Sequence, residues 1–219
     1  MHHPIDLHGQ VLHALPDGSL FWPERRLLCV SDLHLGKSER LARRGGALLP
    51  PYETRETLMR LDAVLEATAP LSVICLGDSF DDSAALGSLE DADRLWLNRM
   101  VAGRDWTWIT GNHDAGPLDI AGSHRAEVTV GTLTFRHIAA PAQQAEVSGH
   151  YHPKARLAGQ AWRCFLADEN RVILPAFGTY TGGLWCHDKA FDALMGPKAR
   201  AVLCGKTARV IPMPRRQAR

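Results

Sequence analysis

The sequence has few cysteines and no closely spaced pair among them. The five are odd in number, far apart and free of any C-x-x-C motif: Cys29, Cys75, Cys164, Cys186 and Cys204. Cys29 and Cys75 lie inside apolar runs, as small buried hydrophobic residues do. This pattern favours a reducing compartment over a disulfide framework.

Long apolar runs are also missing. The opening residues MHHPIDLHGQ lack the apolar stretch of a signal peptide, and no later run approaches the roughly 20 residues of a membrane-spanning helix. We therefore expect a soluble cytoplasmic protein with no membrane partner.

An excess of one charge is absent too, since the formal net charge is only +1. A strong nucleic-acid footprint would show a clear surplus of Lys and Arg. The overall charge therefore neither implies nor excludes a nucleic acid as partner.

The order of the expected elements predicts an α/β fold in one domain over residues 1–219, with 45% hydrophobic residues to form its core. An opening hairpin is expected over 10–22. Short apolar runs predict buried strands, and helical spacing lies between them: strands at 27–32, 71–78 and 106–114, helices at 52–67 and 89–102. The later half is strand-like with little helix, at 128–137, 145–152, 162–177 and 208–213. We therefore expect a second sheet packed on the first.

Side chains that bind metals follow these apolar runs. They are Asp32 and His34 in SDLH, Asp78 in LGDSFDD, Asn112 and His113 in GNHD, His137 in FRH, and His150 and His152 in GHYH. Each motif alone is common in turns, but five such motifs at five strand ends are not a coincidence. Carboxylate and amide oxygens mixed with imidazoles suit manganese, iron or zinc. With one bridging carboxylate, the set is large enough for two ions, which can clamp a phosphoryl group during in-line displacement.

The order D-x-H, G-D-x-x-D, G-N-H-D, H, G-H-x-H resembles the calcineurin-like metallophosphoesterase superfamily, from about Ser31 to Pro153. The resemblance implies a four-layer sandwich of two mixed β-sheets flanked by α-helices, with the metals at the strand ends. It also implies two ligand sets that share Asp78 as a bridge: Asp32, His34, Asp78 and His152 for one ion, and Asp78, Asn112, His137 and His150 for the other.

In this superfamily the histidine of G-N-H is not a ligand but a general acid, and here that residue is His113. In the related phosphatases an aspartate three residues after the bridging one holds the acid, which implies Asp81. Asp82 and Asp114 are rivals for this role, and the sequence leaves the choice among the three open.

Longer stretches resemble the bacterial ligase-associated DNA damage response endonucleases over nearly the whole chain. They include SDLHLGKSERLARR, LGDSFDD, WITGNHD and LPAFGTYTGGL. The resemblance implies hydrolysis of DNA phosphodiesters in repair. From the ligand chemistry we expect two divalent ions, most of all manganese, with iron or zinc as alternatives. The resemblance also implies a functional association with a repair ligase and helicase. Members of this family often have His where this chain has Asp81, which leaves the partner of His113 in doubt.

Three arginines follow the first motif and should therefore lie near the metals: Arg40, Arg43 and Arg44. They are candidates for contact with substrate phosphates, and the alternative is a solvated helix face. Our prediction is a dimetal DNA endonuclease acting on single strands or processed ends. The alternatives are a phosphodiesterase for small nucleotides or cyclic diesters, and a non-catalytic scaffold. Whether the chain forms a homodimer stays open.

Overall fold

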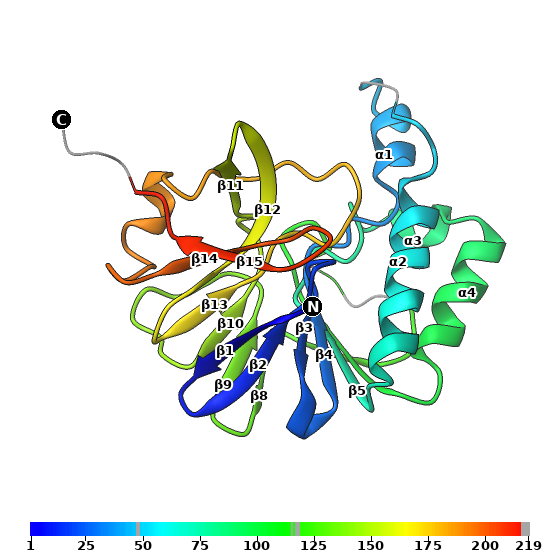
Figure 1. Cartoon of the computed structure of the whole chain (residues 1–219). Helices are drawn as coiled ribbons and strands as arrows, with labels where there is room; N and C mark the ends of the chain where they lie inside the picture. Colours follow the sequence, from blue (N-terminus) through cyan, green and yellow to red (C-terminus); the bar gives the residue numbers. More distant parts are fainter. Residues whose placement is uncertain (47–48, 115, 117–118, 216–219) are drawn as a thin grey trace.

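The computed structural model describes the whole chain except residues 47–48, 115, 117–118 and 216–219. The described residues form two mixed β-sheets packed face to face, with α-helices on the outer side of the first sheet (Figure 1). The predicted α/β architecture with two mixed sheets is confirmed.

The first sheet has seven strands in sequence order. They are β1 (His3–Leu7), β2 (Gln10–Ala14), β3 (Leu20–Trp22), β4 (Leu27–Val30), β5 (Ser72–Cys75), β6 (Asp105–Ile109) and β7 (Ser123–Arg125). Strands β1 to β4 are antiparallel, and β4 to β7 are parallel. The hairpin expected over 10–22 is β2–β3, and β4, β5 and β6 match the expected buried strands.

The second sheet has the order β15-β14-β12-β13-β10-β9-β8, and β11 pairs with β12. Its strands are β8 (Glu127–Val130), β9 (Leu133–Arg136), β10 (Glu146–Ser148), β11 (Lys154–Leu157), β12 (Gln160–Ala167), β13 (Arg171–Ile173), β14 (Arg200–Leu203) and β15 (Arg209–Pro212). Strand β10 lies parallel to both β9 and β13. The segment expected as one strand over 128–137 is a hairpin, because Gly131 (φ 60°) turns the chain between β8 and β9.

The helices are α1 (Lys37–Arg43), α2 (Glu53–Thr68), α3 (Ala85–Ser88) and α4 (Asp91–Val101), with short 3-10 helices η1 (Pro23–Arg25) and η2 (Lys189–Phe191). Helix α2 buries Leu58, Leu61 and Leu65 at the expected helical spacing. It ends because Ala69 adopts a left-handed conformation (φ 42°) directly before Pro70. Helix α4 likewise matches the one expected at 89–102.

Buried side chains fill three layers between the elements. One core lies between the two sheets, where Leu76, Phe135 and Phe165 meet, and a second lies between the first sheet and the helices. The third covers the outer face of the second sheet, where η2 and its neighbouring chain contribute Phe191 and Met195. The outermost layer on this side is a 3-10 helix and irregular chain.

The parallel strands of both sheets end on the same side of the sandwich. The chain that leaves β4, β5 and β6 in one sheet and β9 and β10 in the other carries all the predicted metal ligands. None of the helices within the described residues has the length and apolar character to cross a membrane.

Candidate metal centre

The backbone at the strand ends is strained. Asp32, His34, Asp78, His150 and His152 all have positive φ angles, between 45° and 71°. This conformation costs a non-glycine residue roughly 1–2 kcal/mol and is concentrated at functional sites. Five of the seven predicted ligands are therefore held in backbone geometry that the surrounding fold must impose.

Backbone hydrogen bonds between the loops that follow the strands impose this backbone geometry. The amide of Asp32 donates to the carbonyl of Gly77 (3.2 Å), and the amide of His34 donates to the carbonyl of Asp78 (2.9 Å). The glycines of the motifs are required for close approach: a Cβ at Gly111 would overlap the Asp78 amide, and one at Gly149 would overlap the Ser31 hydroxyl. The glycines of G-N-H-D and G-H-x-H thus let four loops approach closely, those that carry Asp32, Asp78, Gly111 and Gly149.

Asp32, His34 and His152 form one ligand cluster, with one ligand atom from each lying within 4.8 Å of the others. Nε2 of His152 is 3.1 Å from Oδ1 of Asp32. The other carboxylate oxygen of Asp32 accepts hydrogen bonds from the Ser31 hydroxyl and the His150 amide. Burial alone would raise the pKa of Asp32, but the His152 and His137 rings hold it below its ordinary value. Asp32 is thus an ionised carboxylate with one oxygen facing the cluster.

Asn112, His137, His150 and Asp78 form the second cluster. Nε2 of His137 lies 3.0 Å from Oδ1 of Asn112, 3.2 Å from Nδ1 of His150 and 3.4 Å from Oδ2 of Asp78. Burial opposes the charged imidazolium of His137, yet Asp78 and Asp32 raise its pKa above the ordinary value. The negative charges of Asp78 and Asp32 therefore favour a cation beside His137.

Both clusters fit divalent metal ions. Atoms bound about 2.1 Å from one ion lie about 3.0–3.4 Å apart in octahedral or tetrahedral geometry, the spacing found around His137. Nδ1 of His137 faces the Leu76 carbonyl at 2.7 Å, so this nitrogen carries the proton and Nε2 is left to bind metal. Nε2 of His34 is buried and has no hydrogen-bond partner among the described residues. An unpaired Nε2 at this position is available to bind a metal ion.

Asp78 belongs to the second cluster, with Oδ2 toward His137 and Oδ1 accepting a hydrogen bond from the His113 amide (2.8 Å). Burial would raise its pKa, but His137 and the other contacts hold it far below the ordinary value, so this carboxylate is ionised. Its sharing between two ions stays a prediction.

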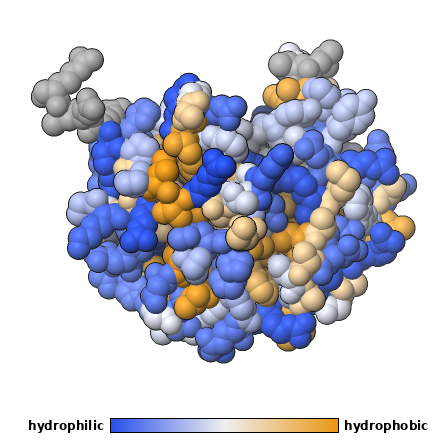
Figure 2. All heavy atoms as spheres, in the orientation of Figure 1, coloured by the Kyte–Doolittle hydropathy of each residue, from blue (hydrophilic) through white to orange (hydrophobic). Residues whose placement is uncertain are grey.

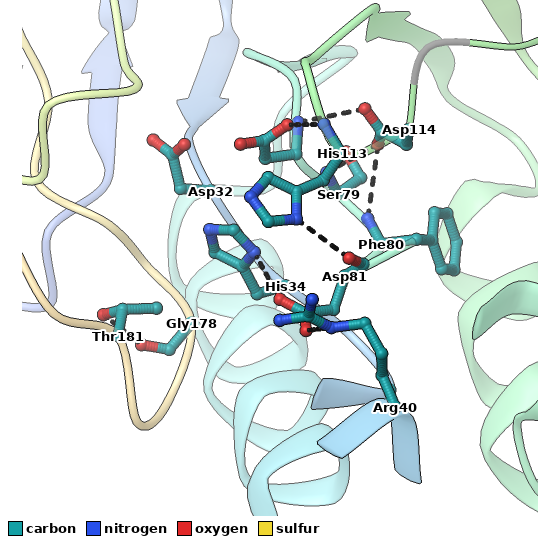
Figure 3. Close-up of polar contacts among 12 residues, drawn as sticks. Asp32, His34, Arg40, Ser79, Phe80, Asp81, His113, Asp114, Gly178 and Thr181 are labelled. Atoms are coloured by element: carbon teal, nitrogen blue, oxygen red, sulfur yellow. Dashed lines mark hydrogen bonds and ion pairs between the residues drawn. The ribbon is translucent and has the colours of Figure 1, made fainter. Parts of the chain in front are cut away.

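His113 lies beside the clusters, half-buried, with its ring edge toward the His34 ring at 5.1 Å between centroids. Its Nδ1 is 2.9 Å from the backbone carbonyl of Asp81 (Figure 3). A carbonyl can only accept, so Nδ1 donates the hydrogen and Nε2 is the ring nitrogen left to exchange a proton with a substrate. This geometry is compatible with the predicted general acid.

The carboxylate of Asp81 pairs with residues other than His113, although one of its oxygens lies within 4.8 Å of a ring nitrogen of His113 and of His34. It contacts Nδ1 of His34 at 2.8 Å and forms a very short ion pair with Nε of Arg40 (Figure 3). Burial would raise the pKa of Asp81, but the hydrogen bond from His34 and the nearby cations hold it below its ordinary value. Asp81 therefore supports His113 through its carbonyl and supports the predicted ligand His34 through its side chain. The contact between His113 and the Asp81 carbonyl could not be predicted from the sequence, because every residue has a backbone carbonyl.

The two rival aspartates have other partners. Buried Asp114 accepts four backbone hydrogen bonds, from Asp78, Ser79, Phe80 and Gly111 (2.7–3.3 Å). It thereby holds the loop that carries Asp78 against the G-N-H-D loop, a role that the sequence analysis missed. The carboxylate of Asp82 pairs with arginines of α1.

The arginines predicted to contact phosphate already have acidic partners. Arg40 pairs with Asp81, Arg43 with Glu39 and Asp82 (3.0 and 2.9 Å), and Arg44 with Asp82 (3.4 Å). Their charges are largely neutralised within the protein, and the Arg44 side chain is the most exposed of the three, at 60%. Contact with substrate stays a prediction for all three.

Comparison with known proteins agrees with this geometry. The profile of the calcineurin-like phosphoesterase family matches residues 25–198. The crystal structure of Pseudomonas putida nuclease MPE is similar, with a TM-score of 0.73 and 29% sequence identity, over 96% of this chain and 100% of that one. A search of curated proteins gave no match. The chain therefore belongs to the calcineurin-like phosphoesterase family, and it is a metal-dependent phosphoester hydrolase.

Proposed function

We propose that the protein is a nuclease that hydrolyses phosphodiester bonds of DNA. The observation that carries the proposal is the pairing of two metal-ligand clusters with a neighbouring histidine that belongs to neither, His113, whose Nδ1 is held by the Asp81 carbonyl. The likeness to a bacterial nuclease over nearly the entire chain supports the choice of nucleic acid over other phosphoesters.

In the proposed reaction, some residues bind the metal ions and another transfers a proton. Asp32, His34 and His152 would hold one ion, and Asn112, His137 and His150 the other, with Asp78 between them. When bound, two divalent ions would neutralise phosphate charge and activate water as a nucleophile. His113 delivers a proton from Nε2 to the departing sugar oxygen, and the Asp81 carbonyl keeps the ring oriented for that transfer.

The finer assignments belong to the same proposal. We infer manganese as the metal, because mixed oxygen and imidazole ligands without thiolates suit it, with iron or zinc as alternatives. The substrate is a single strand or a processed end, and the reaction serves DNA repair in the cytoplasm beside a ligase and a helicase.

The test is incubation of the purified protein with circular single-stranded DNA and a panel of divalent metals. We expect linear products, most of all with Mn²⁺, and none with Asp78→Asn. A protein that leaves the circles intact with every metal, but hydrolyses bis(p-nitrophenyl) phosphate, would instead be a small-diester phosphodiesterase. Inactivity on both substrates with metal bound would favour the scaffold alternative.

A further inference from the structure

A cluster of cations and aromatic rings lies just past the metal-ligand histidines. Nζ of Lys154 is 4.7 Å and Cζ of Arg156 is 5.1 Å from the Trp185 ring centroid. The His187 ring is parallel to that of Trp185, with 6° between planes and 6.3 Å between centroids. We call these four residues the Trp185 cluster.

The cluster is fixed to the metal centre by backbone hydrogen bonds. Leu184 donates to Tyr151 (3.1 Å), Lys154 donates to Leu184 (2.9 Å), and Cys186 donates to Lys154 (2.9 Å). Trp185 is therefore paired with chain that begins two residues after His152, about 7 Å in an extended backbone. In addition, a Cβ at Gly183 would overlap the His152 carbonyl, so the loop leading to Trp185 packs directly on a metal ligand.

The cations of this cluster differ from those of α1 in having no acidic partner. Within the part of the chain that the structure describes, Lys154 and Arg156 form no ion pair with a carboxylate, whereas Arg40, Arg43 and Arg44 all do. Arg156 is exposed and donates to the Gly159 carbonyl. Two positive charges beside the metal centre are thus available to an anionic partner.

The shape of the surface is suitable for a chain-like ligand. A cleft of about 230 Å³ is lined by the cluster and Pro214. The β11–β12 hairpin and α1 project from the same end of the molecule (Figure 1), and the surface is hollowed between these two projections (Figure 2). The cleft itself is bounded by β11 and by the chain that follows β15.

We propose that the Trp185 cluster binds the stretch of single-stranded nucleic acid adjoining the phosphodiester at the metal centre. A base stacks on the platform of Trp185 and His187, while Lys154 and Arg156 contact backbone phosphates. Aromatic platforms beside unpaired cations are the usual means of binding single strands without sequence preference. The turn that follows Trp185 brings the His187 ring parallel to the Trp185 ring, as such a platform requires. The inference rests on the proposed nuclease function. It specifies that the nuclease accepts a single-stranded segment next to the bond that is cut.

The test measures binding of a fluorescent oligothymidylate by anisotropy, with Ca²⁺ in place of the catalytic metal, for Trp185→Leu and Trp185→Phe. We expect Kd to rise roughly 5- to 150-fold for Trp185→Leu, the usual worth of one base–aromatic stack, and to change little for Trp185→Phe. Hydrolysis of bis(p-nitrophenyl) phosphate should be unaffected by either, because that substrate is too small to reach the platform.

The cations are tested by salt dependence. Replacing Lys154 and Arg156 together by Gln should lower the slope of log Kd against log salt by about 1.4, since each contact to a single strand contributes about 0.7. The matched control is Arg25→Gln, because Arg25 also lies over a tryptophan, Trp22 (5.7 Å), but at the opposite end of β4 from the metals. The control should leave the slope unchanged.

These experiments distinguish a failure of strand binding by the Trp185 cluster from a failure of the proposed nuclease activity. If wild-type protein cuts DNA and the Trp185 and cation variants bind it as well as wild type, the cluster is structural and the inference is wrong. If the wild type binds the oligonucleotide through the cluster but cuts no DNA with any metal, the nuclease proposal fails and the binding site stands. Should Trp185→Leu fail to fold by circular dichroism, the cation variants decide.

Discussion

Nδ1 of His34 lies 2.8 Å from Oδ1 of Asp81, and this contact leaves the buried Nε2 of His34 without a partner among the described residues. A carboxylate behind a metal-binding histidine fixes its tautomer and strengthens it as a ligand. The aspartate expected to hold the general acid therefore contacts a predicted metal ligand with its side chain.

Asp81→Asn should accordingly weaken metal binding by 10- to 100-fold, the usual effect of losing such a partner. The measurement is calorimetric titration with Mn²⁺. Asp82→Asn is the matched control, because its carboxylate contacts only arginines and a backbone amide, and should bind Mn²⁺ as the wild type does. Unchanged Mn²⁺ affinity in Asp81→Asn, together with slower turnover, would return Asp81 to the role of partner for His113.

The arginines of α1 should differ from one another when replaced by Gln. Arg40→Gln removes the ion pair that holds Asp81, so it should reduce Mn²⁺ affinity as well as turnover. Arg44→Gln removes an exposed side chain 3.4 Å from Asp82, so it should leave metal binding intact and lower the salt slope of DNA binding by at most about 0.7. Loss of metal in Arg44→Gln would show that the helix is structural throughout.

Metal stoichiometry tests the ligand sets. We expect two ions per chain in Mn²⁺-saturated protein. Asn112→Ala should weaken one site, whereas Asp78→Ala should reduce occupancy at both, because only Asp78 is predicted to bridge. Elemental analysis after dialysis gives the counts. A single site in the wild type, or two full sites in Asp78→Ala, would contradict this assignment.

The convergence of the predicted ligands could be expected from the sequence because each lies where an apolar parallel strand ends, and parallel strands deliver their carboxyl ends to one edge. The contacts made by the neighbouring carboxylates could not be predicted from the sequence. Asp81, Asp82 and Asp114 are all acidic loop residues, and only the fold shows that Asp114 binds four amides while Asp81 binds His34. Strand β14 was missed for a similar reason: its four residues, Arg200–Leu203, are defined by pairing with β12 and β15, far along the chain.

Stability depends on a buried ion pair next to the metal centre. Arg171 and Glu146 are almost fully buried, 3.2 Å apart, and Arg171 also donates to the carbonyls of Ala140, Pro141 and Gln143 in the chain that follows His137. Arg171→Leu should cost about 3–5 kcal/mol in the free energy of unfolding, because buried Glu146 keeps only the longer ion pair with Arg136 (3.4 Å). Urea denaturation measures it. The exposed pair Arg94–Asp91 is the control, and Arg94→Leu should cost at most about 1 kcal/mol. Similar costs for the two variants would mean that Glu146 finds another partner.

His113 gives the sharpest test of the proposed chemistry. Its ring contacts the Asp81 carbonyl and lies outside both ligand clusters, so His113→Ala should retain both ions. Without a positioned acid, DNA cleavage should slow by roughly 10²- to 10⁴-fold. A deoxyribose alkoxide needs a proton as it departs, whereas a nitrophenolate does not. The variant should therefore keep far more of its activity on bis(p-nitrophenyl) phosphate than on DNA. Equal losses on the two substrates, with metal content unchanged, would mean that His113 stabilises charge on the phosphoryl group instead of delivering a proton.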